Sequence, residues 1–196
     1  MSSILNSTKK IALFTVVTVT ALIVVYFVTG CSSSGSSSTT SSTTASATTT
    51  IQRDGYSFES PSDWTWEDNS DTTLTCSPGG DKSGETIVLQ EITVDQKVSS
   101  SALTSDDLHT YWFKDEEIGS IKQSYSEVED FTVGTYDWVR GTETMEGSGH
   151  STKGYKVVGS VSPSRYIVID YSSYTGNEDL KHLDEFKQMV DSLRLS

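Results

Sequence analysis

An uncharged apolar run near the N-terminus constrains this chain more than any other feature. Two lysines, Lys9 and Lys10, precede the run, and no charged residue occurs from Ile11 to Val28. A secretory signal has an apolar core of about 7–15 residues, whereas a membrane-spanning helix needs roughly 20. The run lies between these lengths, so length alone does not decide whether it is cleaved. In both cases the lysines stay on the cytoplasmic side, and the rest of the chain is expected outside the membrane.

The residues that close the apolar run point to a specific anchor. Val28-Thr29-Gly30-Cys31 resembles the lipobox of prokaryotic lipoproteins, in which an aliphatic residue and two small residues precede a cysteine. The cysteine thiol is the nucleophile that takes the lipid. The resemblance implies that residues 1–30 are a lipoprotein signal peptide and that Cys31 is the lipid-attachment site, on the outer face of a prokaryotic cell membrane. The alternative is an uncleaved single-pass signal anchor.

The charge of the chain makes some partners unfavourable. The 196 residues carry a net charge of −13, and all 27 acidic residues follow Cys31. Without Lys9 and Lys10, 12 basic residues remain against these 27 acidic ones, a net charge of −15. Such a charge repels nucleic acid and anionic lipid head groups, so neither is an expected ligand.

Composition divides the remaining chain into two parts. Residues 31–50 are almost entirely Ser and Thr after the cysteine, which predicts a disordered tether with a reach of about 25 Å. Residues 51–196 contain all four Trp residues and enough apolar residues for one core, which predicts a single globular domain. Its only cysteine, Cys76, is expected to be a buried small apolar residue.

Apolar periodicity predicts strands over most of this domain. The expected strands are 56–59, 64–66, 73–76, 86–94, 121–125, 131–133, 136–145, 154–161 and 165–174, and an acidic turn is expected at 67–71. A first helix is expected to begin at Thr104, with Leu108, Trp112, Phe113 and Ile118 toward the core. A second is expected from Asn177 to about Leu193, with an apolar stripe on one side. The fold class is therefore α+β, a mostly antiparallel sheet with about two helices.

Two patterns resemble a known family. Gly55-Tyr56-Ser57-Phe58 followed by Pro61 and Trp64 resembles the opening of PsbP-like domains, and Tyr166-Ile167-Val168-Ile169 followed by a helix with Phe186 and Leu193 is similar to their close. The resemblance covers nearly all of 51–196 and implies an α/β/α sandwich around a mostly antiparallel sheet. Photosynthetic members assist the oxygen-evolving complex, and many prokaryotic relatives are surface lipoproteins. Fold alone does not transfer an activity.

Candidate chemical groups are scattered, so no catalytic, cofactor-binding or metal-binding residue is assigned. His109, His150 and His182 lack metal-ligand spacing, and the first and third are expected to be exposed on helices. Carboxylates at 67–71, 115–117 and 127–130 could form a weak divalent-cation site if two groups met, but a solvated surface is the simpler interpretation. The segment 79–83 is interpreted as a hairpin turn rather than a phosphate loop. Three aromatic residues could form a binding platform or belong to the core: Tyr56, Trp64 and Trp66.

Three functions remain open from the sequence. The favoured one is a non-enzymatic binding or accessory module, anchored at the membrane and directed at a protein or cell-envelope component. A tether raises the effective concentration near surface partners, which suits a binding module. A carrier of a small ligand or divalent cation is the first alternative and would need a concave pocket. An enzyme acting on envelope polymers is the other, and would need titratable groups with perturbed pKa values.

The intact mass of the native protein extracted from membranes tests the anchor. We expect a mass that begins at Cys31 plus acyl chains, because the lipobox directs both lipidation and cleavage. Cys31→Ser is the matched control and should retain residues 1–30 without lipid. A wild-type protein that keeps its N-terminal residues and carries no lipid would establish the signal anchor instead.

Overall fold

The computed structural model describes residues 47–80, 83–93, 102–147, 150–173 and 179–196. Cys31 and most of the predicted tether lie outside these residues. The described helices are α2 (Ser105–Trp112) and α3 (Leu183–Asp191). The described strands are β1 (Thr48–Arg53), β2 (Tyr56–Pro61), β3 (Trp66–Ser70), β4 (Thr73–Cys76), β5 (Glu85–Thr93), β6 (Glu116–Ile118), β7 (Ile121–Val133), β8 (Tyr136–Gly147), β9 (His150–Ser162), β10 (Arg165–Ser173) and β11 (Arg194–Leu195).

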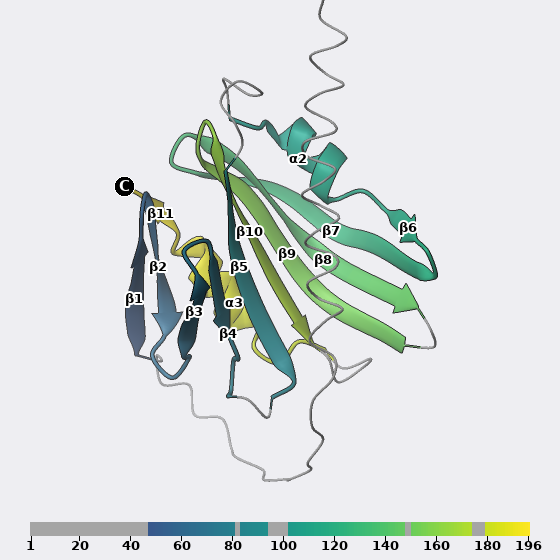
Figure 1. Ribbon diagram of the computed structural model, residues 1–196, viewed down its shortest axis with the longest axis horizontal. Helices are drawn as coiled ribbons and strands as arrows, with labels where there is room; N and C mark the ends of the chain where they lie inside the picture. Colours follow the sequence, from purple (N-terminus) through teal and green to yellow (C-terminus); the bar gives the residue numbers. More distant parts are fainter. Residues whose placement is uncertain (1–46, 81–82, 94–101, 148–149, 174–178) are drawn as a thin grey trace, which may run out of the picture.

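The strands form two antiparallel sheets (Figure 1). The large sheet has eight strands in the order β3-β4-β5-β10-β9-β8-β7-β6, and the small one has the order β1-β2-β11. Long hairpins build the large sheet, because β7, β8, β9 and β10 follow one another in sequence and pair in sequence order. The C-terminal strand β11 pairs with β2, which brings the end of the chain beside the start of the domain. A mostly antiparallel α+β fold with two helices is therefore confirmed.

The central strands of the large sheet are buried on both faces. Val157 and Ile167 belong to one apolar cluster, whereas their neighbours Val158 and Val168 belong to another. Successive side chains of a strand point to opposite faces, so the two clusters lie on opposite sides of the sheet. Helix α3 contributes Phe186, Met189 and Val190 to the first cluster, and α2 contributes Leu108 and Trp112 to the second. Each helix therefore covers one face.

The two helices begin for different physical reasons. Helix α2 starts with a capping box, in which the Thr104 side chain accepts from the Asp107 backbone and the Asp107 side chain accepts from the Thr104 backbone, as the sequence predicts. Helix α3 starts at Leu183, six residues later than expected from Asn177, which lies outside the described residues. The side chain of its N-cap, His182, makes no capping bond. The helix ends at Asp191, and Leu193 is nevertheless buried.

Four further expectations about local structure are wrong. The strand expected at 64–66 does not form, because only Trp66 is in a strand, as the first residue of β3. The segment expected to be an acidic turn, 67–71, is mostly strand β3, and its exposed position at the edge of the sheet explains why polar residues are tolerated there. Ile118, expected in the core, is 45% exposed on β6. Strand β1 begins at Thr48, so the last three residues of the predicted tether belong to the small sheet.

The contact between Gly159 and Trp138 predicts a severe substitution. A Cβ atom on Gly159 would lie 1.9 Å from Trp138 Cδ2, and the Trp138 side chain is fully buried. Gly159→Ala should therefore lower the free energy of unfolding by about 3 kcal/mol or more, measured by urea denaturation. Combining it with Trp138→Leu should cost less than the sum of the two single changes, because the clash is then removed. Ser160→Ala is the control and should change stability by less than about 1 kcal/mol.

Candidate functional site

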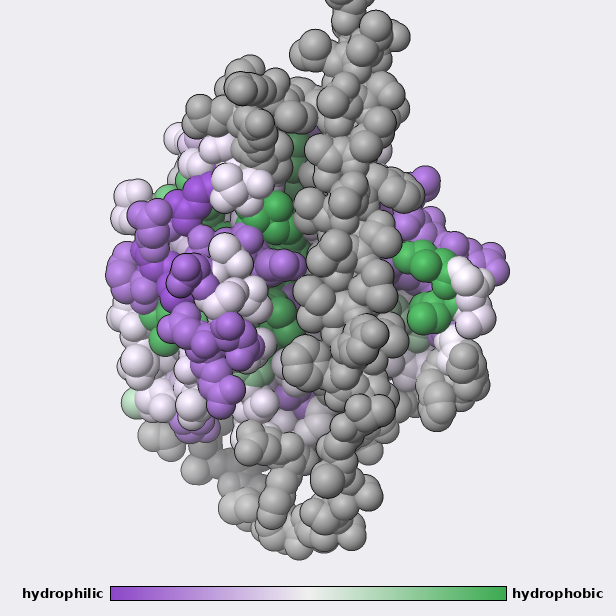
Figure 2. Space-filling model, in the orientation of Figure 1, coloured by the Kyte–Doolittle hydropathy of each residue, from purple (hydrophilic) through white to green (hydrophobic). Residues whose placement is uncertain are grey.

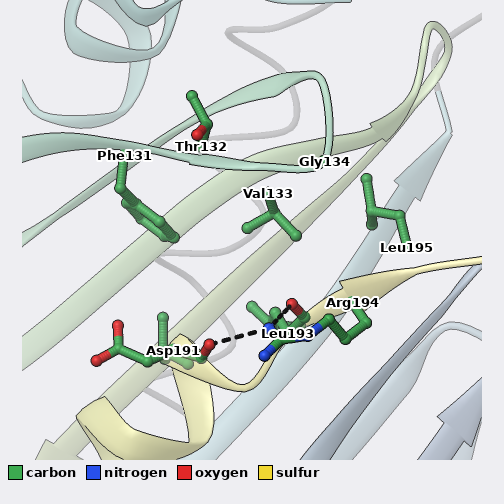
Figure 3. A pocket seen from close by; sticks show the side chains of 9 residues that line it. Phe131, Thr132, Val133, Gly134, Asp191, Leu193, Arg194 and Leu195 are labelled. Carbon is green, nitrogen blue, oxygen red and sulfur yellow. Dashed lines mark hydrogen bonds between the residues drawn. The ribbon is translucent and has the colours of Figure 1, made fainter.

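A groove lies beside the C-terminus of the described chain (Figure 3). Its volume is about 490 Å³. One wall is the end of β7 with the following turn, and the other is the end of α3 with β11. The apolar part of the lining comes from both walls, with Phe131 and Leu195 partly exposed and Val133, Val190 and Leu193 buried beneath them. The groove is thus bordered by segments that are far apart in the sequence.

An arginine holds one end of the groove in place. Arg140 Nε lies 2.7 Å from Glu129 Oε1, and its Nη1 lies 2.7 Å from Asp191 Oδ1. Its guanidinium carbon also lies 5.0 Å from the centre of the Phe131 ring. These contacts connect β7 and β8 with the last turn of α3. At the other end, a Cβ on Gly134 would lie 3.3 Å from Leu195 Cδ1, so the hairpin turn and β11 approach closely.

A second group of interest is a buried charged cluster on the sheet face that α2 partly covers. Lys156 Nζ lies 2.6 Å from Asp170 Oδ1 and 3.3 Å from Glu143 Oε1. Tyr125 donates its hydroxyl to Glu143 Oε1 at 2.8 Å, and Gln123 donates its amide to the same oxygen. One lysine and two carboxylates give this cluster a formal charge of −1.

The cluster changes the pKa values of its members. Burial by itself would lower the pKa of Lys156, but Asp170 and Glu143 raise it well above the ordinary value for lysine. Burial raises the pKa of Asp170, although Lys156 opposes the change. Burial also raises the pKa of Tyr125. Lysine and tyrosine therefore keep their protons at neutral pH, and the contacts of Lys156 with two carboxylates are maintained.

The buried carboxylate of Glu85 fixes the start of α3. Glu85 Oε1 accepts from the Tyr171 hydroxyl at 3.0 Å and from the Lys181 backbone at 2.5 Å. Glu85 Oε2 lies 2.6 Å from His182 Nδ1, and the Tyr171 hydroxyl accepts from the His182 backbone at 3.0 Å. These bonds satisfy backbone donors just before the helix, so they replace the side-chain cap that α3 lacks. His182 was expected on an exposed helical surface and instead belongs to this network.

Two arginines join the small sheet to the large one. Arg165 pairs with Asp54 and Glu91, each at 2.8 Å, and Arg53 pairs with Asp68 at 2.6 Å. They line a polar depression of about 710 Å³. The surface over β1 to β4 is largely hydrophilic in this view (Figure 2). Because each arginine already binds a carboxylate, the depression has the character of a structural salt-bridge network.

The structure places the other sequence-predicted residues apart from one another. His109 lies on α2 and pairs with Asp130 at 2.6 Å, and His150 begins β9. Tyr56 and Trp64 are buried, so they form core rather than a binding platform, and partly buried Trp66 packs against the same cluster. Cys76 is buried as expected, and burial, with a contribution from Asp63, raises the pKa of its thiol to about 12. No group of three or more His, Cys, Asp or Glu side chains within the described ranges is placed to hold a metal ion.

Sequence reasoning missed the groove and the two buried carboxylate networks. Lys156 and Asp170 each interrupt an apolar strand. A charged residue within such a strand could have indicated the buried charged cluster. Glu85 comes just before the predicted strand 86–94 and gave no comparable signal. The groove depends on β11, which has only two residues and pairs with a strand far away in the sequence.

The comparisons with known proteins identify the fold. No family model and no curated protein matches this sequence. The structure is similar to the solution structure of cyanobacterial PsbP (CyanoP) from Synechocystis, with a TM-score of 0.56 and 13% identity over 81% of this chain and 98% of that one. The expected PsbP-like fold is supported by this likeness.

Two other solved structures show lower similarity. LpqN of Mycobacterium tuberculosis, described as involved in cell envelope biogenesis, has a TM-score of 0.43 and 13% identity over 76% of this chain and 91% of that one. A crystal structure from Bacteroides thetaiotaomicron has a TM-score of 0.46 and 11% identity over 72% of this chain and 45% of that one. The fold assignment rests on CyanoP.

Removing the lysine of the charged cluster should destabilise the protein in a pH-dependent way. Lys156→Met leaves the carboxylates of Asp170 and Glu143 buried without their counter-charge. We expect a loss of about 3–5 kcal/mol in the free energy of unfolding at pH 7. The loss should shrink toward pH 4, because Asp170, whose pKa is raised by burial, can then take up a proton. Urea denaturation across this pH range measures the effect.

Asp170→Asn is the matched control for this prediction. The folded-state pKa of Asp170 is raised, so its contribution to stability is fully present below its ordinary pKa of 3.8 and is lost as the pH rises through the folded-state value. Wild type should therefore lose stability relative to Asp170→Asn as the pH rises above about 4. Equal pH profiles for all three proteins would show that the cluster is solvated rather than buried.

Proposed function

We propose that this protein is a non-enzymatic, membrane-anchored extracytoplasmic lipoprotein that binds a protein or cell-envelope partner through the groove between β7 and β11. The observation that carries this proposal is the groove itself. It is about 490 Å³ in volume, has apolar side chains on both walls, and lies between the end of β7 that β6 does not cover and β11, an edge strand of the small sheet. Concave apolar surfaces with a polar rim are the usual places for recognition.

The state of the reactive side chains supports a binding role over catalysis. The Cys76 thiol is buried and protonated, and His109 and His182 are each paired with a carboxylate. Lys156 lies between two carboxylates. A nucleophile or general base would need such a group directed at an open cleft. In the described part of the chain the two histidines and the lysine instead contact carboxylates, and the thiol is buried.

The anchor is supported by the sequence. The lysine pair, the apolar run and Val28-Thr29-Gly30-Cys31 together form the signal and lipobox pattern. None of the described helices has the length and apolar character required to cross a membrane. For the domain, we propose the PsbP-type α/β/α sandwich, because the two helices pack on opposite faces of the large sheet.

Site-specific photo-crosslinking in native membranes tests the proposed function. A benzophenone amino acid is introduced into the full-length protein at Arg194, which lines the groove, and separately at Thr110, an exposed residue of α2. We expect a discrete crosslinked partner from position 194 and none from position 110.

Two results would contradict the proposal. Equal crosslinking from both positions would show that contact does not depend on the groove. A product with twice the mass of the chain would identify a second copy of this protein, and not a separate partner, as the occupant.

A further inference from the structure

We propose that the groove takes an extended polypeptide segment of the partner, which adds to the outer edge of β7 as a new strand and alternates apolar with cationic residues. This inference rests on the proposed binding function and specifies its partner. It follows from the free edge of β7, from the direction of its backbone groups and from the charge around it.

The outer edge of β7 is available over its second half. Strand β6 pairs with β7 only from Ile121 to Gln123, and no other described strand lies beside β7 on that side. An irregularity in the β7–β8 pairing between Ser126 and Glu129 separates this covered part from the rest. Such a bulge ends regular pairing locally. The free part that borders the groove is therefore 129–133.

The pairing register shows which backbone groups are free. Val133 and Tyr136 flank a two-residue turn and are partners, so their backbone groups bond each other. In an antiparallel pair, residues alternate between bonding the partner strand and pointing away from it. The N–H and C=O groups of Thr132 and Asp130 therefore point away from β8, toward the position of an added strand. These groups are a template for strand addition.

The faces of β7 determine the side chains that the new strand needs. Phe131 and Val133 point to the face that carries the groove, and residues directly opposite them on an added strand would enter the groove. Apolar residues suit these positions. The side chain of Asp130 lies on the other face, where it contacts His109 at 2.6 Å and is still 55% exposed, so a cationic residue opposite it would give this carboxylate a second partner. The partner segment therefore alternates apolar and cationic residues.

The charge of the protein favours such a partner over a second copy of itself. The chain from Cys31 onward has a net charge of −15. Near the groove, Arg140 pairs with both Glu129 and Asp191, so these three groups together carry one negative charge, and the exposed carboxylate of Asp130 lies on the neighbouring face. Two copies that met at this edge would bring like charges together, which is unfavourable. A cationic segment is attracted to the same surface.

Binding of a defined peptide tests strand addition. The probe is a fluorescein-labelled peptide of four Lys-Val repeats, titrated against the full-length protein in neutral nanodiscs and followed by fluorescence anisotropy. Thr132→Pro removes the outward N–H without disturbing the bonds to β8, because proline is tolerated where an edge N–H faces solvent. We expect Thr132→Pro to weaken binding at least tenfold, and Thr132→Ala, which keeps the N–H, to change it less than twofold.

Changes to the peptide separate strand addition from simple charge attraction. Methylating alternate backbone nitrogens of the probe keeps its side chains and charge but removes donors, and we expect it to abolish binding. A Glu-Val peptide should not bind. Peptide binding that is unaffected by methylation and by Thr132→Pro overturns strand addition, and a crosslink from position 194 would then leave the binding function standing. Absence of both peptide binding and the crosslink overturns both proposals.

Discussion

Burial of the central strands on both faces is the constraint on which the rest of this structure depends. Val157 and Val158 are fully buried on opposite sides of β9, and Ile167 and Val168 are fully buried on opposite sides of β10. A strand that is apolar on both faces gains from the hydrophobic effect only if both faces are covered. The chain has two described helices for this purpose, and each packs on one face. The positions of α2 and α3 therefore follow from the composition of β9 and β10.

Buried charged side chains on the large sheet are accommodated in two ways: they form ion pairs with one another, and a glycine leaves room for one of them. A Cβ on Gly154 would lie 3.3 Å from Glu143 Oε2, so this glycine leaves room for the carboxylate above the sheet. Lys156 then neutralises part of the charge that Glu143 and Asp170 introduce. At the opposite face, Glu85 binds the backbone just before α3 and fixes where the covering helix begins. Buried charges in this protein thus orient elements that apolar contacts hold together.

The sequence was sufficient to predict a structural feature wherever residues close together in the chain determine that feature. The apolar periods of β5 and β10, the capping box at Thr104 and the burial of Cys76 could all be predicted, because neighbouring residues determine each of them. The start of α3 could not be predicted, since it depends on Glu85 from a strand far away in the sequence. Strand β3 could not be predicted either, because exposed edge strands carry polar residues that resemble a turn. The groove required β11 to pair with β2, a contact between the two ends of the domain.

The same long-range pairing explains why the groove suits a tethered protein. The pairing of β11 with β2 places the C-terminal wall of the groove in the same small sheet as β1, the strand in which the predicted tether ends. A single added strand of a few residues binds weakly, because its ordering entropy offsets much of the gain from backbone hydrogen bonds. Holding the domain at the membrane raises its effective concentration toward partners on the same surface. In the proposed arrangement, the anchor supplies the part of the affinity that a short edge cannot, and the net negative charge of the chain favours cationic segments over other extended ones.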